Sequence, residues 1–151
     1  MKARLRSKLA FCLENGLNLM EFGAGQGRKG VVIMVTLGTG IGSAVFLDGE
    51  LVPNTELGHL ELHGADAELH SSDRIREEQG LSWPDWATRV QDYIAHVERL
   101  ISPDLIVLGG GVSKKADRFL PYVKVGTPVV PAVLQNNAGI VGAAMAATGR
   151  F

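Results

Sequence analysis

The stretch that decides the fold is VVIMVTLGTGIGSAVFLDGELV, which occupies residues 31–52. It opens with a continuous apolar run rich in β-branched side chains, as expected of a strand covered on both faces. The predicted elements are a strand over 31–37, a turn over 38–42, a strand over 43–47, a two-residue hairpin turn at Asp48-Gly49 and a strand over 50–52. Three consecutive antiparallel strands are therefore expected.

The rest of the chain alternates helical patterns with short apolar runs. The predicted elements are a helix over 73–79 capped by Ser72, a helix over 83–102, a strand over 105–108, a helix over 114–120 capped by Ser113, a strand over 129–130 and a last helix capped by Asn137. The apolar side of the helix over 83–102 comprises Trp86, Val90, Tyr93, Ile94, Val97, Leu100 and Ile101. This order predicts an α/β fold with a mixed sheet, in which three antiparallel strands precede strand–helix units.

Length and composition indicate one globular domain. The 151 residues are 46% hydrophobic and 21% charged, with a formal net charge of -1, which gives no electrostatic reason to expect nucleic-acid or membrane binding. No apolar run approaches the roughly 18–20 residues of a membrane span, so a cytoplasmic protein is expected. We expect a divergent helix and Gly-rich connector over 1–29, followed by the domain proper over 30–151.

The first candidate site is the Gly-rich turn between the first two strands. Gly38, Thr39, Gly40 and Gly42 leave successive backbone N–H groups bare, and with the Thr hydroxyl they could bind phosphoryl oxygens. The alternative is an ordinary Gly-rich hairpin turn.

The second candidate site follows the buried strand over 105–108. Gly109, Gly110, Gly111 and Ser113 open a helix at a point where a base or ribose could lie against the backbone. Close packing of a helix on a strand would equally require glycine, so both interpretations stay open.

A third candidate site lies in residues 54–72, which show no clear period and hold three of the four histidines. Glu56 and His59 are three residues apart around a glycine, and such a pair can hold vicinal hydroxyls of a sugar. His59, His63 and His70 with Glu56 are conceivable metal ligands. Their spacings match no zinc pattern, and the one cysteine, Cys12, supplies no multi-thiolate site, so no metal is expected.

In chain order these motifs resemble the C-terminal domain of ROK-family sugar kinases, most closely the polyphosphate glucokinases, from about Glu21 to Ala147. The matching stretches are 37–42 for the second phosphate motif, 56–59 for the sugar-binding E-x-G-H, 108–113 for the adenosine motif, and 127–132 with 134–144 for the C-terminal signature. The resemblance implies one ribonuclease-H-like half-domain of the actin-like ATPase architecture. Most ROK members carry a cysteine-rich zinc loop after E-x-G-H; its absence here resembles the polyphosphate-using branch and argues against zinc.

Two parts of the family pattern have no counterpart. The N-terminal domain with its D-x-G-G-T phosphate motif is missing, and the family's Asn-Asp pair, whose Asp is the general base, would fall at Ala10-Phe11. We therefore expect no catalytic base here, and a truncated half that is inactive alone.

The resemblance implies phosphoryl transfer from polyphosphate or ATP to the 6-hydroxyl of glucose, with Mg²⁺ carried by the donor phosphates. Phosphate binding then falls to Gly38, Thr39, Gly40 and Gly42, and sugar binding to Glu56 and His59. Nucleoside binding falls to Gly109, Gly110, Gly111 and Ser113. Expected partners are glucose, the phosphoryl donor, and a second copy or a complementing N-terminal half. The alternatives are a non-catalytic sugar- or phosphate-binding or dimerisation module, and the ROK repressor branch, which the lack of a preceding helix-turn-helix disfavours.

Overall fold

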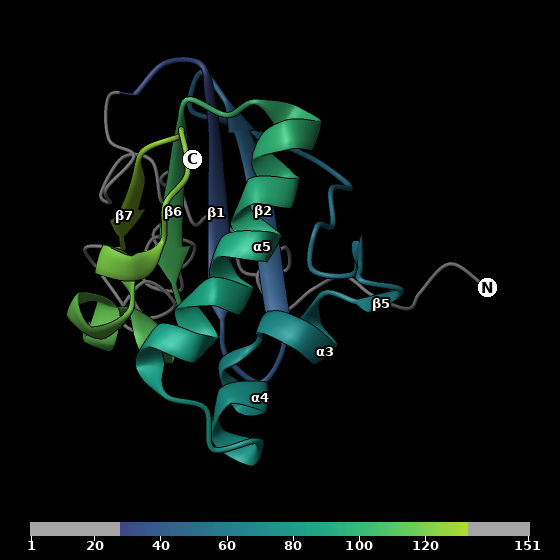
Figure 1. Cartoon of the computed structure of the whole chain (residues 1–151). Helices are drawn as coiled ribbons and strands as arrows, with labels where there is room; N and C mark the ends of the chain where they lie inside the picture. The colour runs from purple at the N-terminus through teal and green to yellow at the C-terminus, as the bar shows by residue number, and fades with distance from the viewer. Residues whose placement is uncertain (1–27, 133–151) are drawn as a thin grey trace, which may run out of the picture.

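The computed structural model describes residues 28–132 as a sheet with helices packed on it (Figure 1). The strands are β1 (Val31–Leu37), β2 (Ile41–Leu47), β3 (Glu50–Val52), β4 (Glu61–Leu62), β5 (Ala65–Asp66), β6 (Leu105–Gly109) and β7 (Val129–Pro131). The helices are α3 (Glu68–Ser71), α4 (Asp73–Glu78), α5 (Trp83–Ile101) and the 3₁₀ helices η1 (Gly111–Arg118) and η2 (Leu120–Tyr122). The helices expected before residue 28 and after Asn137 lie outside the described residues.

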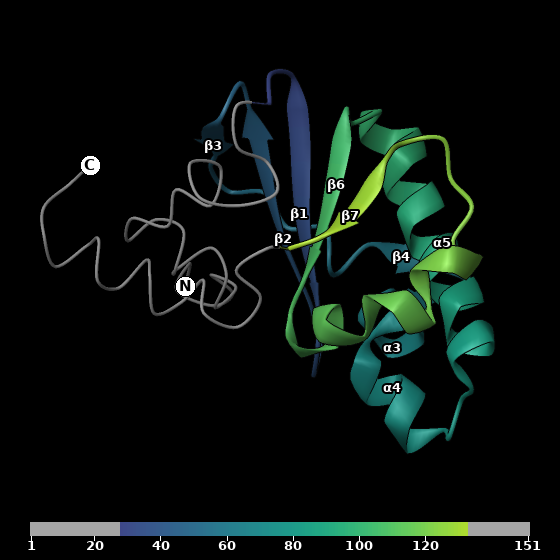
Figure 2. The same ribbon diagram turned by 90° about the vertical axis from the view of Figure 1, so that its left-hand side faces the viewer.

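The main sheet has the strand order β3-β2-β1-β6-β7. The first three strands pair antiparallel, whereas β6 pairs parallel with both β1 and β7. Figure 2 shows α3, α4 and α5 together on one side of this sheet. The predicted α/β class is confirmed, with three antiparallel strands ahead of the strand–helix units.

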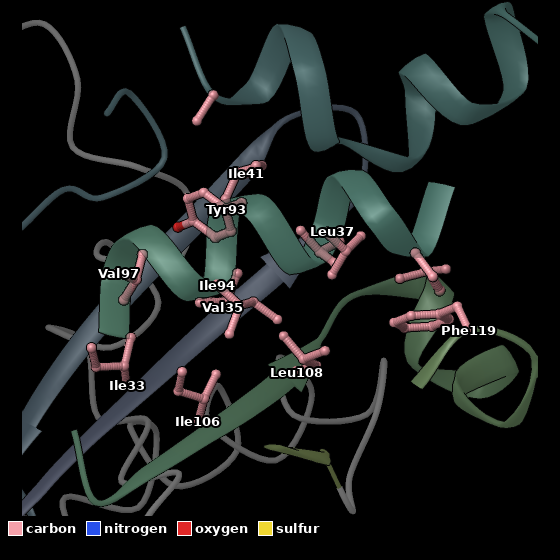
Figure 3. Packing of buried hydrophobic residues seen from close by; sticks show 14 of the residues in the cluster. Ile33, Val35, Leu37, Ile41, Tyr93, Ile94, Val97, Ile106, Leu108 and Phe119 are labelled. Atoms are coloured by element: carbon pink, nitrogen blue, oxygen red, sulfur yellow. The ribbon is translucent and has the colours of Figure 1, made fainter. Parts of the chain in front are cut away.

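Side chains of β1 point alternately to the two faces of the sheet, which explains its continuous apolar sequence. Ile33, Val35 and Leu37 belong to the core beneath α5, where Figure 3 shows them among the α5 side chains. The opposite face carries a second buried cluster of Val32, Met34, Ala44, Phe46, Leu105, Val107 and Ala132. The expected apolar side of α5 is buried up to Val97, but Leu100 is 58% exposed and does not belong to the core.

The hairpin between β2 and β3 follows the sequence prediction. Asp48 and Gly49 have φ angles of 51° and 91°, the left-handed conformation that a two-residue turn of this kind requires. Strand β2 begins at Ile41 rather than at 43, because Ile41 pairs with Leu37 at the start of the ladder.

Of the two predicted caps, Ser72 is confirmed in position, as the N-cap residue of α4, whereas Ser113 is wrong. Ser113 does not begin a helix: η1 starts at Gly111, and the Ser113 hydroxyl donates to the Gly110 carbonyl at 2.7 Å. Ser72 does stand before α4, yet its hydroxyl makes no cap hydrogen bond and is buried without a partner. The loop over 54–72 also holds regular structure that no period indicated, namely the small β4–β5 hairpin and α3.

Candidate functional site

The two Gly-rich turns lie side by side at the carboxyl ends of the neighbouring strands β1 and β6. Strands β1 and β6 run parallel with Thr36 opposite Gly109, so the turns that follow them leave the sheet at the same end. In open α/β sheets, ligands bind outside the carboxyl ends of the strands. The structure thus brings the predicted phosphate turn after β1 and the predicted nucleoside turn after β6 together.

The turn after β1 is held by its own backbone and by α4. The Gly38 N–H donates to the Gly40 carbonyl at 3.0 Å, and Thr39 is exposed. Arg74 fixes the turn from outside: its backbone N–H donates to the Gly38 carbonyl at 3.1 Å, and its Nε donates to the Thr39 carbonyl at 2.9 Å. A side-chain atom added at Gly38 would meet no protein atom within 4 Å, so this residue faces open space.

Gly42 is placed differently from the other glycines of this motif. It lies inside β2, opposite Thr36, whose hydroxyl donates weakly to the Gly42 carbonyl at 3.5 Å. The exposed turn therefore consists of residues 38–40.

Packing accounts for one glycine of the second turn. Gly110 has a φ of 86°, and a Cβ there would lie 2.7 Å from the Leu37 carbonyl oxygen. Gly109 faces the side chains of Met34 and Thr36, whereas Gly111 faces open space. The packing interpretation thus has direct support at Gly110, and a nucleoside role for the turn stays a prediction.

Glu56 accepts two hydrogen bonds, and its neighbour Leu57 is bonded to β2 and to α5. Its Oε1 accepts from the Ser43 hydroxyl at 3.2 Å and from the Gly58 N–H at 2.9 Å. Ser43 Oγ in turn accepts from the Leu57 N–H at 2.7 Å, while the Tyr93 hydroxyl on α5 donates to the Leu57 carbonyl at 3.3 Å. Glu56 is partly buried, and among the described residues it makes no ion pair in the core.

His59 is exposed and is oriented by β5. Its Nδ1 lies 2.7 Å from Asp66 Oδ2, and this hydrogen bond raises the pKa of His59 against the opposing effect of burial. Glu68 lies beside the pair: its N–H donates to Asp66 Oδ1 at 3.2 Å, and nitrogen and oxygen atoms of the three side chains all lie within 4.8 Å of one another.

The segment from Glu56 to Glu68 contacts the end of the first Gly-rich turn and the start of β2. A Cβ added at Gly40 would overlap the Glu68 carboxylate, so this side chain lies directly against the turn. A Cβ at Gly58 would overlap the Ile41 carbonyl oxygen, one residue beyond the turn. The segment that carries Glu56, His59 and Glu68 therefore packs beside Gly40 and Ile41.

The chain is similar to curated proteins of one kind over most of its length. A polyphosphate glucokinase of Mycobacterium tuberculosis strain H37Rv is 50% identical over 131 residues, which cover 87% of this chain and 49% of that protein. The polyphosphate glucokinase of Mycobacterium leprae is 47% identical over 133 residues, which cover 88% of this chain and 41% of that protein. This chain is homologous to the C-terminal half of the polyphosphate glucokinases. It spans about half the length of these relatives.

Two solved structures superpose on this chain. The crystal structure of an inorganic polyphosphate/ATP-glucomannokinase from Arthrobacter sp. strain KM superposes with a TM-score of 0.82 at 56% identity, over 87% of this chain and 53% of that one. A ROK-family glucokinase from Streptomyces griseus, in complex with glucose and AMPPNP, superposes with a TM-score of 0.68 at 21% identity, over 85% of this chain and 63% of that one. The half-domain of the actin-like ATPase fold is thereby confirmed. No family model matches the chain.

Four side chains of this site were not found by motif analysis: Ser43, Asp66, Glu68 and Arg74. The hydrogen bonds of Asp66, Ser43 and Arg74 span 7, 13 and 35 positions in the sequence, and the Glu68 side chain lies against Gly40. Asp66 and Glu68 could have been suspected from the sequence, because two acidic residues two positions apart follow the E-x-G-H motif closely. No sequence pattern indicated Arg74.

Among the described residues, two groups of side chains have atoms close enough to hold a metal ion. One is His59, Asp66 and Glu68, and the other is His63, His70 and Asp92. Over the same residues, no helix is both long and apolar enough to cross a membrane.

Proposed function

We propose that residues 30–151 form the C-terminal domain of a polyphosphate-type glucokinase and supply the cleft wall that holds the phosphoryl donor and the sugar. The observation that supports this most directly is that the segment from Glu56 to Glu68 packs at the end of the 38–40 turn: Gly58 lies against Ile41 at the start of β2, and the Glu68 side chain of α3 lies against Gly40. Homologues named for polyphosphate, ATP and glucose or mannose support the same substrate classes.

Donor phosphates would bind at Gly38, Thr39 and Gly40. The Gly38 N–H already donates to the Gly40 carbonyl, so the donors suited to phosphoryl oxygens are the N–H groups of Thr39 and Gly40 and the Thr39 hydroxyl. Arg74 fixes the turn and adds a positive charge beside it. Mg²⁺ would arrive on the donor phosphates and neutralise charge during transfer. The Glu68 carboxylate against Gly40 is an acidic group suited to hydrogen-bonding the water shell of that ion. When ATP is the donor, its nucleoside would lie at Gly109, Gly110, Gly111 and Ser113.

Sugar hydroxyls would bind at Glu56 and His59. The Glu56 carboxylate accepts two protein hydrogen bonds at Oε1, which leaves acceptor capacity for two hydroxyl groups. His59 contacts Asp66 through Nδ1, which leaves Nε2 for a hydroxyl. Because the Glu56 contacts are partly buried, the carboxylate is positioned before the sugar binds, and this reduces the entropy cost of binding.

These residues supply positioning and charge neutralisation rather than proton abstraction. The family's general base would align with Phe11, so the proton of the sugar 6-hydroxyl would pass to a carboxylate supplied by a complementing half. We therefore expect binding by this chain alone and turnover only with such a half.

NMR titration of the isotopically labelled chain tests both sites separately. Polyphosphate should shift the amide signals of 38–42, and glucose those of 56–59 with a dissociation constant of about a millimolar or weaker, because few contacts offset the cost of immobilising the ligand. Glu56→Gln should weaken glucose binding and leave the polyphosphate shifts unchanged. If polyphosphate moves other signals and leaves 38–42 in place, the phosphate assignment is wrong.

A complementation assay tests the reaction itself. Glucose 6-phosphate should form when the chain is mixed with the separately expressed N-terminal half of the M. tuberculosis homologue, and Glu56→Gln should abolish it. Polyphosphate and glucose shifts without turnover in this mixture would favour the non-catalytic binding module.

A further inference from the structure

A second group of side chains gathers at the far end of the β4–β5 hairpin and shares no residue with the sugar site. His63 stands in the hairpin turn, His70 on α3, and Asp92 on α5. One nitrogen or oxygen atom from each lies within 4.8 Å of the other two. Three separate elements thus direct metal-ligating atoms to one point.

The distances in this cluster approach those around a bound ion. His63 Nε2 lies 3.3 Å and His70 Nε2 lies 3.8 Å from the same oxygen, Asp92 Oδ2. Ligand atoms on a tetrahedral zinc ion, with bonds of about 2.0–2.2 Å, lie about 3.3–3.6 Å apart. The third separation, between one nitrogen of each imidazole, is within 4.8 Å, so the two rings would move closer together when they hold one ion.

His70 shows that the cluster is incomplete as it stands. Its Nε2 is buried and has no hydrogen-bond partner among residues 28–132, although it lies 3.8 Å from Asp92 Oδ2 and its ring centroid lies 5.0 Å from that of His63. A buried polar nitrogen without a partner costs free energy, and a metal ion bound there would remove that cost. Arg89, beside His70, opposes a cation, whereas the Asp92 carboxylate favours one.

The turn that carries His63 is suited to hold a ligand in place. His63 and Gly64 have φ angles of 55° and 78°, so they form a tight two-residue turn rather than a flexible loop. The His63 side chain is 60% exposed, which leaves an open path for an ion and room for water as a fourth ligand.

We propose that His63, His70 and Asp92 bind one zinc-type divalent transition-metal ion, which ties the β4–β5 hairpin and α3 to α5. Two imidazoles and one carboxylate are ligands that zinc, cobalt, nickel and copper prefer, whereas magnesium and calcium prefer oxygen alone. The sequence expectation of no metal rested on spacing and missing thiolates. Neither consideration reveals a ligand set that the fold assembles from positions 63, 70 and 92.

Calorimetric titration of the full chain with Zn²⁺ tests the site, and the visible absorption of bound Co²⁺ reports its geometry. We use His63→Asn, because asparagine tolerates the positive φ, together with His70→Gln and Asp92→Asn. The matched control is His96→Gln, which changes the histidine of α5 that lies outside the cluster. Circular dichroism checks that each variant is folded.

We expect one equivalent of Zn²⁺ to bind, and each cluster variant to weaken binding by about tenfold or more, since even outer-shell changes cost 10–100-fold. His96→Gln should bind as the parent does, and millimolar Mg²⁺ should not compete. Bound Zn²⁺ should raise the unfolding temperature of the parent and not that of His63→Asn. Zn²⁺ binding that survives all three cluster variants, or that His59→Asn abolishes instead, would overturn the proposal.

Discussion

Replacing Ser43 with alanine should remove the support beneath the proposed sugar carboxylate. Ser43 is fully buried in β2, and its hydroxyl both donates to Glu56 Oε1 at 3.2 Å and accepts from the Leu57 N–H at 2.7 Å. In Ser43→Ala the Leu57 N–H has no acceptor within the fold, and Glu56 keeps only the donor at Gly58. The substitution changes no surface charge, so its effect reports on these two hydrogen bonds.

The expected loss of stability follows from the two contacts. A partly buried N–H left without an acceptor costs about 1–3 kcal/mol, and a hydrogen bond to a carboxylate contributes about 1.5–3 kcal/mol when fully shielded. Glu56 is only partly buried and retains its hydrogen bond from Gly58, so the loss of the Ser43–Glu56 hydrogen bond costs about 1.5 kcal/mol or less. We expect Ser43→Ala to lower the free energy of unfolding by about 2–3 kcal/mol, or the unfolding temperature by roughly 5–10 °C.

Urea unfolding followed by tryptophan fluorescence measures this change, because Trp86 is fully buried against Phe119. Thr36→Val is the matched control: it removes a hydroxyl from the neighbouring strand whose only described bond is 3.5 Å long, and we expect a change within about 0.5 kcal/mol. If Ser43→Ala costs no more than Thr36→Val, the hydroxyl does not support the loop. Ser43→Ala should also weaken the glucose-induced shifts at Glu56 while leaving those of polyphosphate unchanged.

Two further substitutions test the contacts around the sugar loop. Gly58→Ala should destabilise the fold by about 1–3 kcal/mol in the same urea assay, because the new Cβ would meet the Ile41 backbone. The control Gly111→Ala, where a Cβ has nothing within 4 Å, should change the free energy of unfolding little. Equal effects of the two substitutions would contradict the close approach of Gly58 to Ile41. Asp66→Asn should lower the pKa of His59, measured from the imidazole proton shifts, since the hydrogen bond to Asp66 raises it. A histidine with a raised pKa stabilises the fold at pH values below its unfolded-state pKa of about 6.5, and this stabilisation is lost as the pH rises through its folded-state pKa. Asp66→Asn should therefore destabilise the fold more at acidic than at alkaline pH. An unchanged pKa of His59 in this variant would exclude the pairing with Asp66.

Elements with strong local signals were predicted well. The apolar run of β1, the Asp48-Gly49 turn and the amphipathic α5 each carry a pattern that belongs to one kind of structure, and all three are present. The short β4 and β5 strands have two residues each, too few for any period to show. Leu100 fits the apolar stripe of α5, but it is near the C-terminal end of that helix and stays exposed.

The chemistry of the site was predicted less completely than the fold. Motifs predicted the turn at 38–42 and the pair Glu56 and His59 as candidate ligand-binding residues, because those residues lie close together in the sequence; their roles stay predictions. Ser43 and Arg74 act on them across 13 and 35 positions, and such contacts depend on the register of β2 and the placement of α4. At Gly110, sequence alone could not separate ligand approach from packing, and the contact with Leu37 supports packing.

The two halves of the proposed sugar site differ in how firmly they are held. Glu56 is tied to β2 through Ser43 and to α5 through the Tyr93 contact with Leu57, both of which are at least partly buried. His59 depends on Asp66, which is only half-buried and belongs to the two-residue strand β5. A metal ion at the other end of that hairpin would restrain β5 without touching the sugar. Zinc should therefore slow amide hydrogen exchange at Asp66 while leaving exchange at Ser43 unchanged.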